Sequence, residues 1–241
     1  DGNLRISEET FLSQVNFENF VRRIMREMGS EASLENPVAS GEWQGYRVQI
    51  VISPISQGTM LCLRKHPKIP WTLDLLEERS FLDPKEKSLL RGLIQSQKSL
   101  LIVGTTGCGK TSLLNACLNS IGSAERALIL EDTSELSCPN SVSSKLLTRS
   151  HGKGLVPPVT LNELVRLALR LRPDRIVIGE VRGHEAKDLL LAISSGHRGS
   201  ICTLHAVNAS EALTRMEMLI QMGAPQWSLS AIRKLIRYSI D

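Results

Sequence analysis

The sequence predicts an α/β protein, in which a mostly parallel sheet with helices on both faces follows a smaller N-terminal α+β domain. Short apolar segments alternate with helical segments from residue 98 onward, which is the pattern of parallel strands joined by crossover helices. A connector with two prolines, residues 66–71, separates this region from a first part with a different pattern. The length of 241 residues accommodates one large domain or two modest ones.

The N-terminal domain, expected over residues 1–65, combines one helix with a small sheet. Residues 16–28 carry apolar side chains at helical spacing, with Asn16 as the expected N-cap and Gly29 as the stop. Two strands complete the domain, at residues 46–53 and 59–65, and residues 54–58 form the turn between them.

Residues 66–82 form the expected linker, because prolines favour an extended connector. The second domain is expected over residues 83–241 and starts at Asp83, where an N-cap, a proline at the first helical position and a capping-box glutamate follow one another. Its strands are expected at residues 99–103, 127–130, 176–178 and 201–204. Its helices are expected at residues 110–120, 161–171 and 184–194.

Composition excludes several classes of protein. Hydrophobic residues make up 41% and charged residues 22%, which argues against disorder. No apolar run approaches the ~18 residues that span a bilayer, and no signal peptide leads the chain. The five cysteines form no C-x-x-C pair, which favours a reducing compartment and predicts no zinc site. Residues 98–241 hold 17 Lys/Arg and 12 Asp/Glu, a net charge of +5 that suits an anionic ligand but is too small to predict a nucleic-acid partner.

A phosphate-binding loop is the most specific motif. Residues 104–111, Gly-Thr-Thr-Gly-Cys-Gly-Lys-Thr, match G-x-x-x-x-G-K-[ST] between an expected strand and an expected helix. The glycines let backbone N–H groups converge on a β-phosphate, Lys110 reaches the β/γ oxygens, and the Thr111 hydroxyl binds Mg²⁺. The predicted ATP-binding residues here are Thr106, Gly107, Cys108, Gly109, Lys110, Thr111 and Ser112. The Cys108 thiol is either an oxidation-sensitive group or an inert space-filling one.

Acidic residues end two of the expected strands. Glu180 is the only acid at the end of the strand around residue 177, and it suits both water activation and contact with Mg²⁺. Glu131, Asp132 and Glu135 follow another strand, on the edge where open α/β sheets bind ligands. Taken alone, that cluster also fits a surface turn. His205 ends a further strand, as a structural histidine or a γ-phosphate sensor.

Four segments, taken in order and spacing, resemble the Walker A, Asp box, Walker B and His box of the bacterial type II/type IV secretion and pilus ATPases: residues 104–111, 131–135, 171–183 and 196–205. The resemblance covers about residues 98–220. A looser similarity, around Arg47 and Arg64, points to the branch with the tight-adherence pilus and conjugation-type secretion ATPases. The absent tetracysteine module supports the same branch.

The resemblance implies a RecA-like P-loop NTPase core, a homohexameric ring and ATP bound with Mg²⁺ between the two domains. It implies hydrolysis of ATP to power pilus assembly, pilus retraction or protein secretion. The implied location is the cytoplasmic face of the bacterial inner membrane, reached through platform proteins. The chain starts at Asp1 and ends within the family's C-terminal helical region, so we expect residues to be missing at both ends.

Residue by residue, the resemblance makes Glu180 the catalytic acid/base and Glu131 the carboxylate nearest the metal. His205 then senses the γ-phosphate or stabilises an interface. Arg47 and Arg64 contact the phosphates, and Arg149 is a weaker candidate for the same role. The family position that usually holds a small residue such as serine holds Cys108 here.

Other readings of the phosphate loop stay open. A small-molecule P-loop kinase would need an arginine-bearing lid, and no lid insertion is visible. A DNA-translocating motor would need aromatic residues among basic ones, and only 4% of residues are aromatic. A non-hydrolysing NTP-dependent assembly switch would bind nucleotide without releasing phosphate. An ABC-transporter ATPase is disfavoured because the chain has no Leu-Ser-Gly-Gly-Gln segment.

Overall fold

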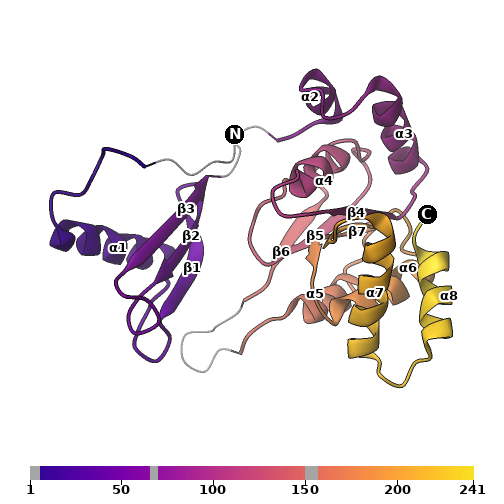
Figure 1. Cartoon of the computed structure of the whole chain (residues 1–241). Coiled ribbons are helices and arrows are strands. Elements are labelled where there is room, and N and C mark those ends of the chain that lie inside the picture. Colours follow the sequence, from indigo (N-terminus) through magenta and orange to yellow (C-terminus); the bar gives the residue numbers. More distant parts are fainter. Residues whose placement is uncertain (1–5, 66–69, 150–156) are drawn as a thin grey trace. The chain divides into compact units, whose positions relative to one another are not determined.

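The computed structural model describes residues 6–65, 70–149 and 157–241. Its contacts divide the chain into two units, residues 1–67 and 68–241 (Figure 1). The confirmed fold class is α/β, with a small antiparallel sheet in the first unit and a parallel sheet in the second.

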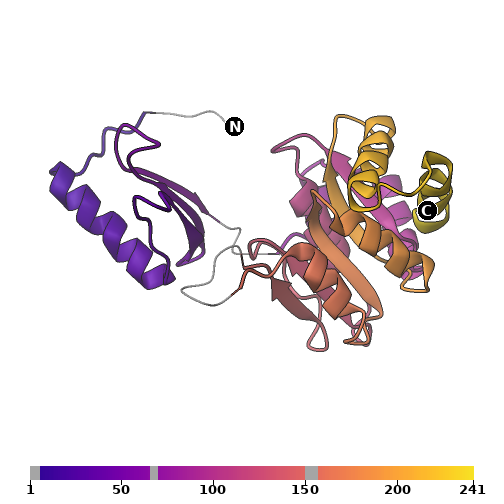
Figure 2. The same cartoon turned by 90° about the horizontal axis from the view of Figure 1, so that it is seen from below.

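The first unit packs one helix on one face of a three-stranded antiparallel sheet. The helix is α1 (Gln14–Met28), and the strands, in spatial order, are β1 (Val38–Trp43), β2 (Tyr46–Val51) and β3 (Met60–Lys65). Val21 and Ile24 of α1 are buried with Val48 and Ile50 of β2, because alternate residues of a strand face the same side. Figure 2 shows α1 lying along this sheet.

Two details of the first unit differ from the sequence prediction. Helix α1 begins earlier than expected, because the N-cap is Ser13, whose Oγ accepts a hydrogen bond from the backbone N–H of Asn16 at 3.2 Å. Asn16 therefore lies in the first turn. The sequence analysis also missed strand β1. The expected stop at Gly29 is confirmed, with φ of 64° in the left-handed region.

The second unit contains a five-stranded parallel sheet in the order β4-β8-β7-β5-β6. The strands are β4 (Leu100–Gly104), β5 (Ala127–Glu131), β6 (Ser144–Leu147), β7 (Arg175–Val181) and β8 (Ile201–His205). The helices are α2 (Leu73–Glu78), α3 (Pro84–Gln95), α4 (Lys110–Leu118), α5 (Leu161–Ala168), α6 (Glu185–Ser194), α7 (Ala209–Gly223) and α8 (Leu229–Ser239).

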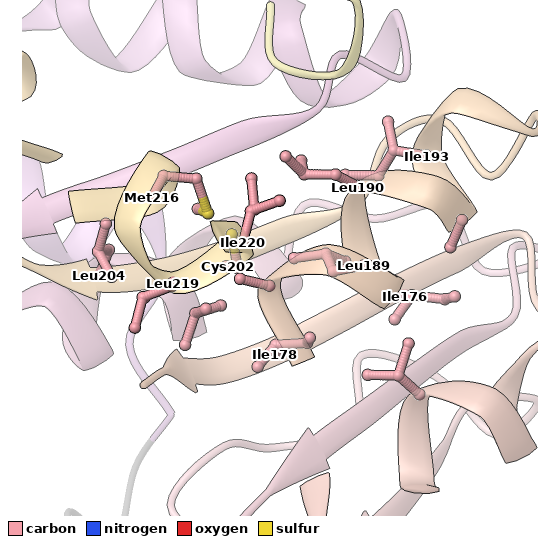
Figure 3. Close-up of a cluster of buried hydrophobic side chains, with 14 of the residues drawn as sticks. Ile176, Ile178, Leu189, Leu190, Ile193, Cys202, Leu204, Met216, Leu219 and Ile220 are labelled. Atoms are coloured by element: carbon pink, nitrogen blue, oxygen red, sulfur yellow. The ribbon is translucent and has the colours of Figure 1, made fainter. Parts of the chain in front are cut away.

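Helices cover both faces of the parallel sheet, as predicted. Alternate residues of β7 separate the two cores, because Ile176 and Ile178 face α5–α8 whereas Val177 faces α2–α4. Figure 3 shows the first core, where β7 and β8 meet α6 and α7. Both faces of the sheet are thus buried, which explains why these strands read as continuous apolar runs.

The segment expected as a linker, residues 66–82, contains helix α2. Residues 66–69 lie outside the described part of the chain. The Thr72 side chain caps α2, and its Leu73 and Leu76 are buried with Leu114 of α4. The described end of the expected linker is therefore part of the second unit. The capping box at Asp83, which starts α3, is confirmed.

The carboxyl ends of four parallel strands gather the polar residues singled out in the sequence. Strands β4, β5 and β8 end at Gly104, Glu131 and His205, and β7 carries Glu180 just before its last residue. Because these strands are parallel, the four ends lie along one edge of the sheet. In the described ranges, no helix has the length and apolar character needed to cross a membrane.

Candidate functional site

The phosphate loop connects β4 directly to α4. Gly107 and Gly109 have φ of 78° and 98°, and this region of φ disfavours side chains with a Cβ. Gly109 is the N-cap of α4, so the first backbone N–H groups of the helix point into the loop. The Lys110 ammonium lies over the loop, where Nζ donates to the carbonyl oxygens of Gly104 at 2.8 Å and Thr105 at 2.7 Å. The arrangement is a binding site for an anion, and the long Lys110 side chain adds a positive charge beside it.

His205 contacts the first half of the phosphate loop. Its Nε2 lies 2.8 Å from Oγ1 of Thr106. The hydrogen bond places the imidazole beside the loop, as a phosphate-sensing role would require. Because β4 and β8 are neighbours, with Gly104 paired to His205, the contact follows from the strand register.

A β-bulge in β7 sets the direction of Glu180. Residues Ile178 and Val181 pair with Cys202 and Leu204, so β7 carries one more residue than β8 between these pairs. Such a bulge re-aims a side chain, and bulges are common beside active sites. The irregularity falls on residues 179 and 180, a feature that single-sequence reasoning did not find.

Glu180 is ion-paired to Arg182, with Oε2 and Nη2 2.6 Å apart. Partial burial alone would raise the pKa of Glu180. The Arg182 hydrogen bond and the charges of Arg182, Lys110 and His205 outweigh burial and hold the pKa below its ordinary value. Glu180 is therefore a carboxylate at neutral pH. Arg182 also approaches Asp132, at 3.5 Å.

Glu131 is buried, with 4% of its surface exposed. Its Oε1 accepts hydrogen bonds from the backbone N–H groups of Glu135 and Leu136, both at 3.0 Å. Its Oε2 is buried with no hydrogen-bond partner, although the Lys145 ammonium lies 3.6 Å away. Burial raises the pKa of Glu131 in spite of these neighbours. One oxygen thus holds the turn at residues 132–136, and the other lies beside the Lys145 ammonium without a hydrogen bond.

Two residues that the sequence analysis did not select hold this acidic turn in place. Asn115 of α4 is buried; its Nδ2 donates to the Glu135 carbonyl at 3.2 Å, and its Oδ1 accepts from the Ser137 N–H at 2.9 Å. Lys145 of β6 donates to Ser134 Oγ at 2.7 Å and to the Leu136 carbonyl. The helix that follows the phosphate loop is therefore bonded directly to the acidic turn.

The three candidate arginines lie apart along the chain. Arg47 and Arg64 belong to the first unit, where they are paired positions on β2 and β3. Arg149 is an exposed residue of the second unit whose guanidinium donates to the Pro157 carbonyl, at 2.8 Å from Nη2. Arg149 also forms an isolated β-bridge with Val159. Residues 150–156 lie outside the described part of the chain.

The chemistry of the donor set fits Mg²⁺ bound together with a nucleotide. In the described ranges, no group of three or more His, Cys, Asp or Glu side chains is placed to hold a metal ion alone. Mg²⁺ commonly takes one or two carboxylates together with substrate phosphates. Thr111, Glu180 and the unpartnered oxygen of Glu131 supply oxygen donors of this kind. Cys108 is exposed and not disulfide-bonded.

The sequence matches the model of the Type II/IV secretion system protein family over residues 38–239. It is 35% identical over 202 residues to the conjugal transfer protein TrbB of Rhizobium radiobacter, covering 82% of this chain and 60% of TrbB. It is 37% identical over 223 residues to the type IV secretion system protein PtlH of Bordetella pertussis, covering 82% of this chain and 66% of PtlH. The chain thus spans 60% and 66% of the lengths of these two curated relatives.

Solved structures show the same fold. The VirB11 ATPase of Brucella suis, in complex with sulphate, matches with a TM-score of 0.60 and 26% identity over 95% of this chain and 74% of that chain. The pilus retraction motor PilT, with bound ADP, matches with a TM-score of 0.67 and 19% identity over 92% of this chain and 62% of that chain. The second likeness concerns the fold alone.

Proposed function

This chain belongs to the type II/IV secretion system protein family, and on that premise we propose that it is the motor ATPase of a conjugation-type or type IV secretion system. The observation that carries the proposal is the meeting, at one sheet edge, of the phosphate loop with Glu180 and His205. The named relatives are conjugal transfer and type IV secretion proteins. They favour this branch over the tight-adherence pilus ATPases, which the sequence resemblance left equally open.

In this proposal, the cradle at residues 106–112 binds the β- and γ-phosphates of ATP. Backbone N–H groups at the start of α4 donate to the β-phosphate, and Lys110 turns from the loop carbonyls toward the phosphate oxygens. Thr111 and Glu180 would hold Mg²⁺, which when bound supplies positive charge beside the phosphates. His205, through Thr106, reports on the γ-phosphate end of the loop.

Glu180 acts as the general base for the attacking water. It is ionised and within the electrostatic reach of Lys110 and His205, and a carboxylate accepts the proton of a positioned water. The Arg182 ion pair holds its side chain in one orientation. The bulge in β7 falls at this residue, near the end of the strand at the edge of the sheet where β4 leads into the loop.

Glu131 serves the metal through its Oε2, the oxygen that has no hydrogen-bond donor. Its Oε1 is committed to the backbone of the acidic turn. Glu131 therefore has two roles in this proposal: it shapes the turn that carries Asp132 and Glu135, and it contributes negative charge beside the cation.

We further propose that the N-terminal module, residues 1–65, supplies Arg47 and Arg64 to the phosphates, with Arg149 as an additional cation. The proposal is supported by the position of the two arginines on neighbouring strands of one small sheet. Helix α2 belongs to the core in this proposal, because its Leu73 and Leu76 are buried with Leu114 of α4, so the module and the core are joined on the N-terminal side of Thr72. Bound γ-phosphate would draw the modules together, and ADP would release them.

The proposed assembly is a homohexamer at the cytoplasmic face of the bacterial inner membrane, working through platform proteins. Neither nucleic acid nor lipid is a direct partner in this proposal. The ring is what the sequence resemblance implies, and membership of the family supports that resemblance.

Phosphate release from Mg-ATP tests the proposed function. The purified chain is incubated without any acceptor, beside Lys110→Ala and Glu180→Gln. The proposal expects turnover that both variants strongly reduce, with ATP binding weakened only in Lys110→Ala. Turnover that needs an added acceptor would identify a kinase instead. Lys110-dependent binding with no phosphate release, even in a hexameric sample, would identify an assembly switch.

A further inference from the structure

An aromatic side chain from outside the four sequence motifs packs against the phosphate loop. Phe81 lies between α2 and α3, and its ring atoms Cε2 and Cζ would be 3.1 and 3.2 Å from a Cβ added at Gly109. The loop can approach the ring this closely because Gly109 has no side chain. The Phe81 side chain is nevertheless 45% exposed. Figure 1 shows α2 and α3 beside α4, the helix that the loop precedes.

The backbone of Phe81 is held firmly in this position. Its N–H donates to the Leu76 carbonyl at 2.9 Å, and Leu76 is buried in the core beneath α4. The Asp83 capping box fixes the chain two residues later. An exposed aromatic ring on a fixed backbone loses little further freedom when it binds a ligand.

The two ends of the loop have different neighbours. Thr106, near the start, is bonded to His205 on the side of the catalytic strands. Gly109, at the end that leads into α4, contacts Phe81. A nucleotide whose γ-phosphate points toward His205 and Glu180 must extend its sugar and base in the other direction. Phe81 lies at that other end of the loop.

We propose that Phe81 stacks on the base of the bound nucleotide. This inference rests on the proposed function, since it takes the loop to bind ATP. The ring meets Gly109 with edge atoms, which leaves a face of the ring for the base. Every base presents a π-face, so stacking on an aromatic side chain adds affinity without choosing between bases. Phe81 thus gives affinity for a nucleoside triphosphate over a bare polyphosphate, and contributes little to a choice of ATP over GTP.

The test compares ligands with and without a base. Dissociation constants for Mg-ATP, Mg-GTP and Mg-tripolyphosphate are measured by calorimetry for the wild type, Phe81→Leu and Phe81→Trp. Phe81→Leu keeps an apolar side chain but removes the π-face. It should raise the dissociation constants of ATP and GTP at least about fivefold, which is the lower end for loss of one base–aromatic stack. The dissociation constant of tripolyphosphate should stay unchanged. Phe81→Trp should retain ATP affinity.

Phe11→Leu is the matched control. Phe11 is 50% exposed, close to the 45% of Phe81, but it packs with Phe17 and Phe20 in the first unit. It should leave all three dissociation constants unchanged. Tripolyphosphate binding also reports whether the loop of each variant is intact.

Two outcomes would overturn the stacking proposal while the proposed function stands. Equal weakening of ATP and tripolyphosphate in Phe81→Leu would mean that the ring only supports the loop. No change in either ligand would mean that the base lies elsewhere. Failure of the wild-type chain to bind ATP in a Lys110-dependent way would instead reject the proposed function, and the stacking inference with it.

Discussion

Arg47 and Arg64 are directly opposite each other on the antiparallel strands β2 and β3. Side chains at such positions share one face of the sheet, with Cβ atoms ~5 Å apart. The register therefore allows both guanidinium groups to reach one anionic ligand, as our proposal for the phosphates requires.

Arg47→Ala and Arg64→Ala should each lower ATP turnover while leaving ADP affinity nearly unchanged. In our proposal both arginines act on the charge of the γ-phosphate, which ADP lacks. ATPase rates and ADP titrations of the two variants and the wild type check this. Equal losses of ADP affinity and turnover would mean that the arginines bind nucleotide generally or support the fold of the first unit.

Glu180→Gln should keep Mg-ATP binding and lower turnover by roughly 100-fold or more, the usual scale for removing an acid/base group. Glutamine keeps the length and an acceptor oxygen but cannot take the proton. Single-turnover phosphate release and ATP titration measure the two effects separately. Near-normal hydrolysis by this variant would show that another group activates the water.

The phosphate loop could be read from the sequence because its chemistry needs particular residues at fixed spacing. The sheet that carries it could be predicted because the middles of β5 and β7 are buried on both faces and are therefore apolar, with charged residues only near the strand ends. The capping box at Asp83 was visible for a similar reason, since one short segment contains the whole motif.

The missed features depend on contacts between distant segments. Strand β1 contains Gly41 and few β-branched residues, and pairing with β2 stabilises it. Strand β6 has four residues at the sheet edge. The roles of Asn115 and Phe81 arise only when α4 meets the acidic turn and the α2–α3 segment. Serine and asparagine are both favoured at N-caps, so the sequence alone could not decide whether α1 begins after Ser13 or after Asn16, and the backbone conformation shows that Ser13 is the N-cap.

The buried contacts of Arg175 make a large contribution to the stability of the second unit in our account. Arg175 is fully buried at the start of β7, where it is ion-paired to Glu125 at 2.7 Å and donates to the Ile94 carbonyl at 2.8 Å. Arg175→Ala should lower the free energy of unfolding by about 3–5 kcal/mol, because it leaves buried acceptors unpaired. Arg233→Ala, which breaks an exposed pair with Glu217, should cost less than about 1 kcal/mol. Urea unfolding of both variants compares them, and similar losses would contradict the assignment.

Glu27 gives the first unit a predictable dependence on pH. Hydrogen bonds from Arg23 and from the Trp43 indole hold the pKa of Glu27 below its ordinary value of 4.5. For an acid whose folded-state pKa is lowered, the added stability is present above the ordinary value and is lost as pH falls through the folded value. Glu27→Gln should therefore reduce amide protection of α1 relative to the wild type at pH 7. Equal protection of the two proteins below the folded-state pKa of Glu27 is the expected limit, and a deficit that stays constant as the pH falls through that pKa would exclude this linkage.

Helix α7 leaves two methionines one turn apart on the surface, Met218 and Met222, each 62% exposed. Contiguous exposed apolar surface marks sites of contact with other chains, and in the proposed ring we assign this pair to the contact between subunits. With the proposed ring, this predicts that the ATPase rate per subunit rises with protein concentration, because each subunit becomes fully active only beside a neighbour. Rates measured across a dilution series, with the oligomeric state determined by light scattering at each concentration, check the prediction. Met218→Lys should shift the rise to higher concentration, since a charge on the stripe opposes association, whereas Lys85→Met on exposed α3 should not. A constant rate per subunit in a sample shown to be monomeric would remove the ring from the mechanism.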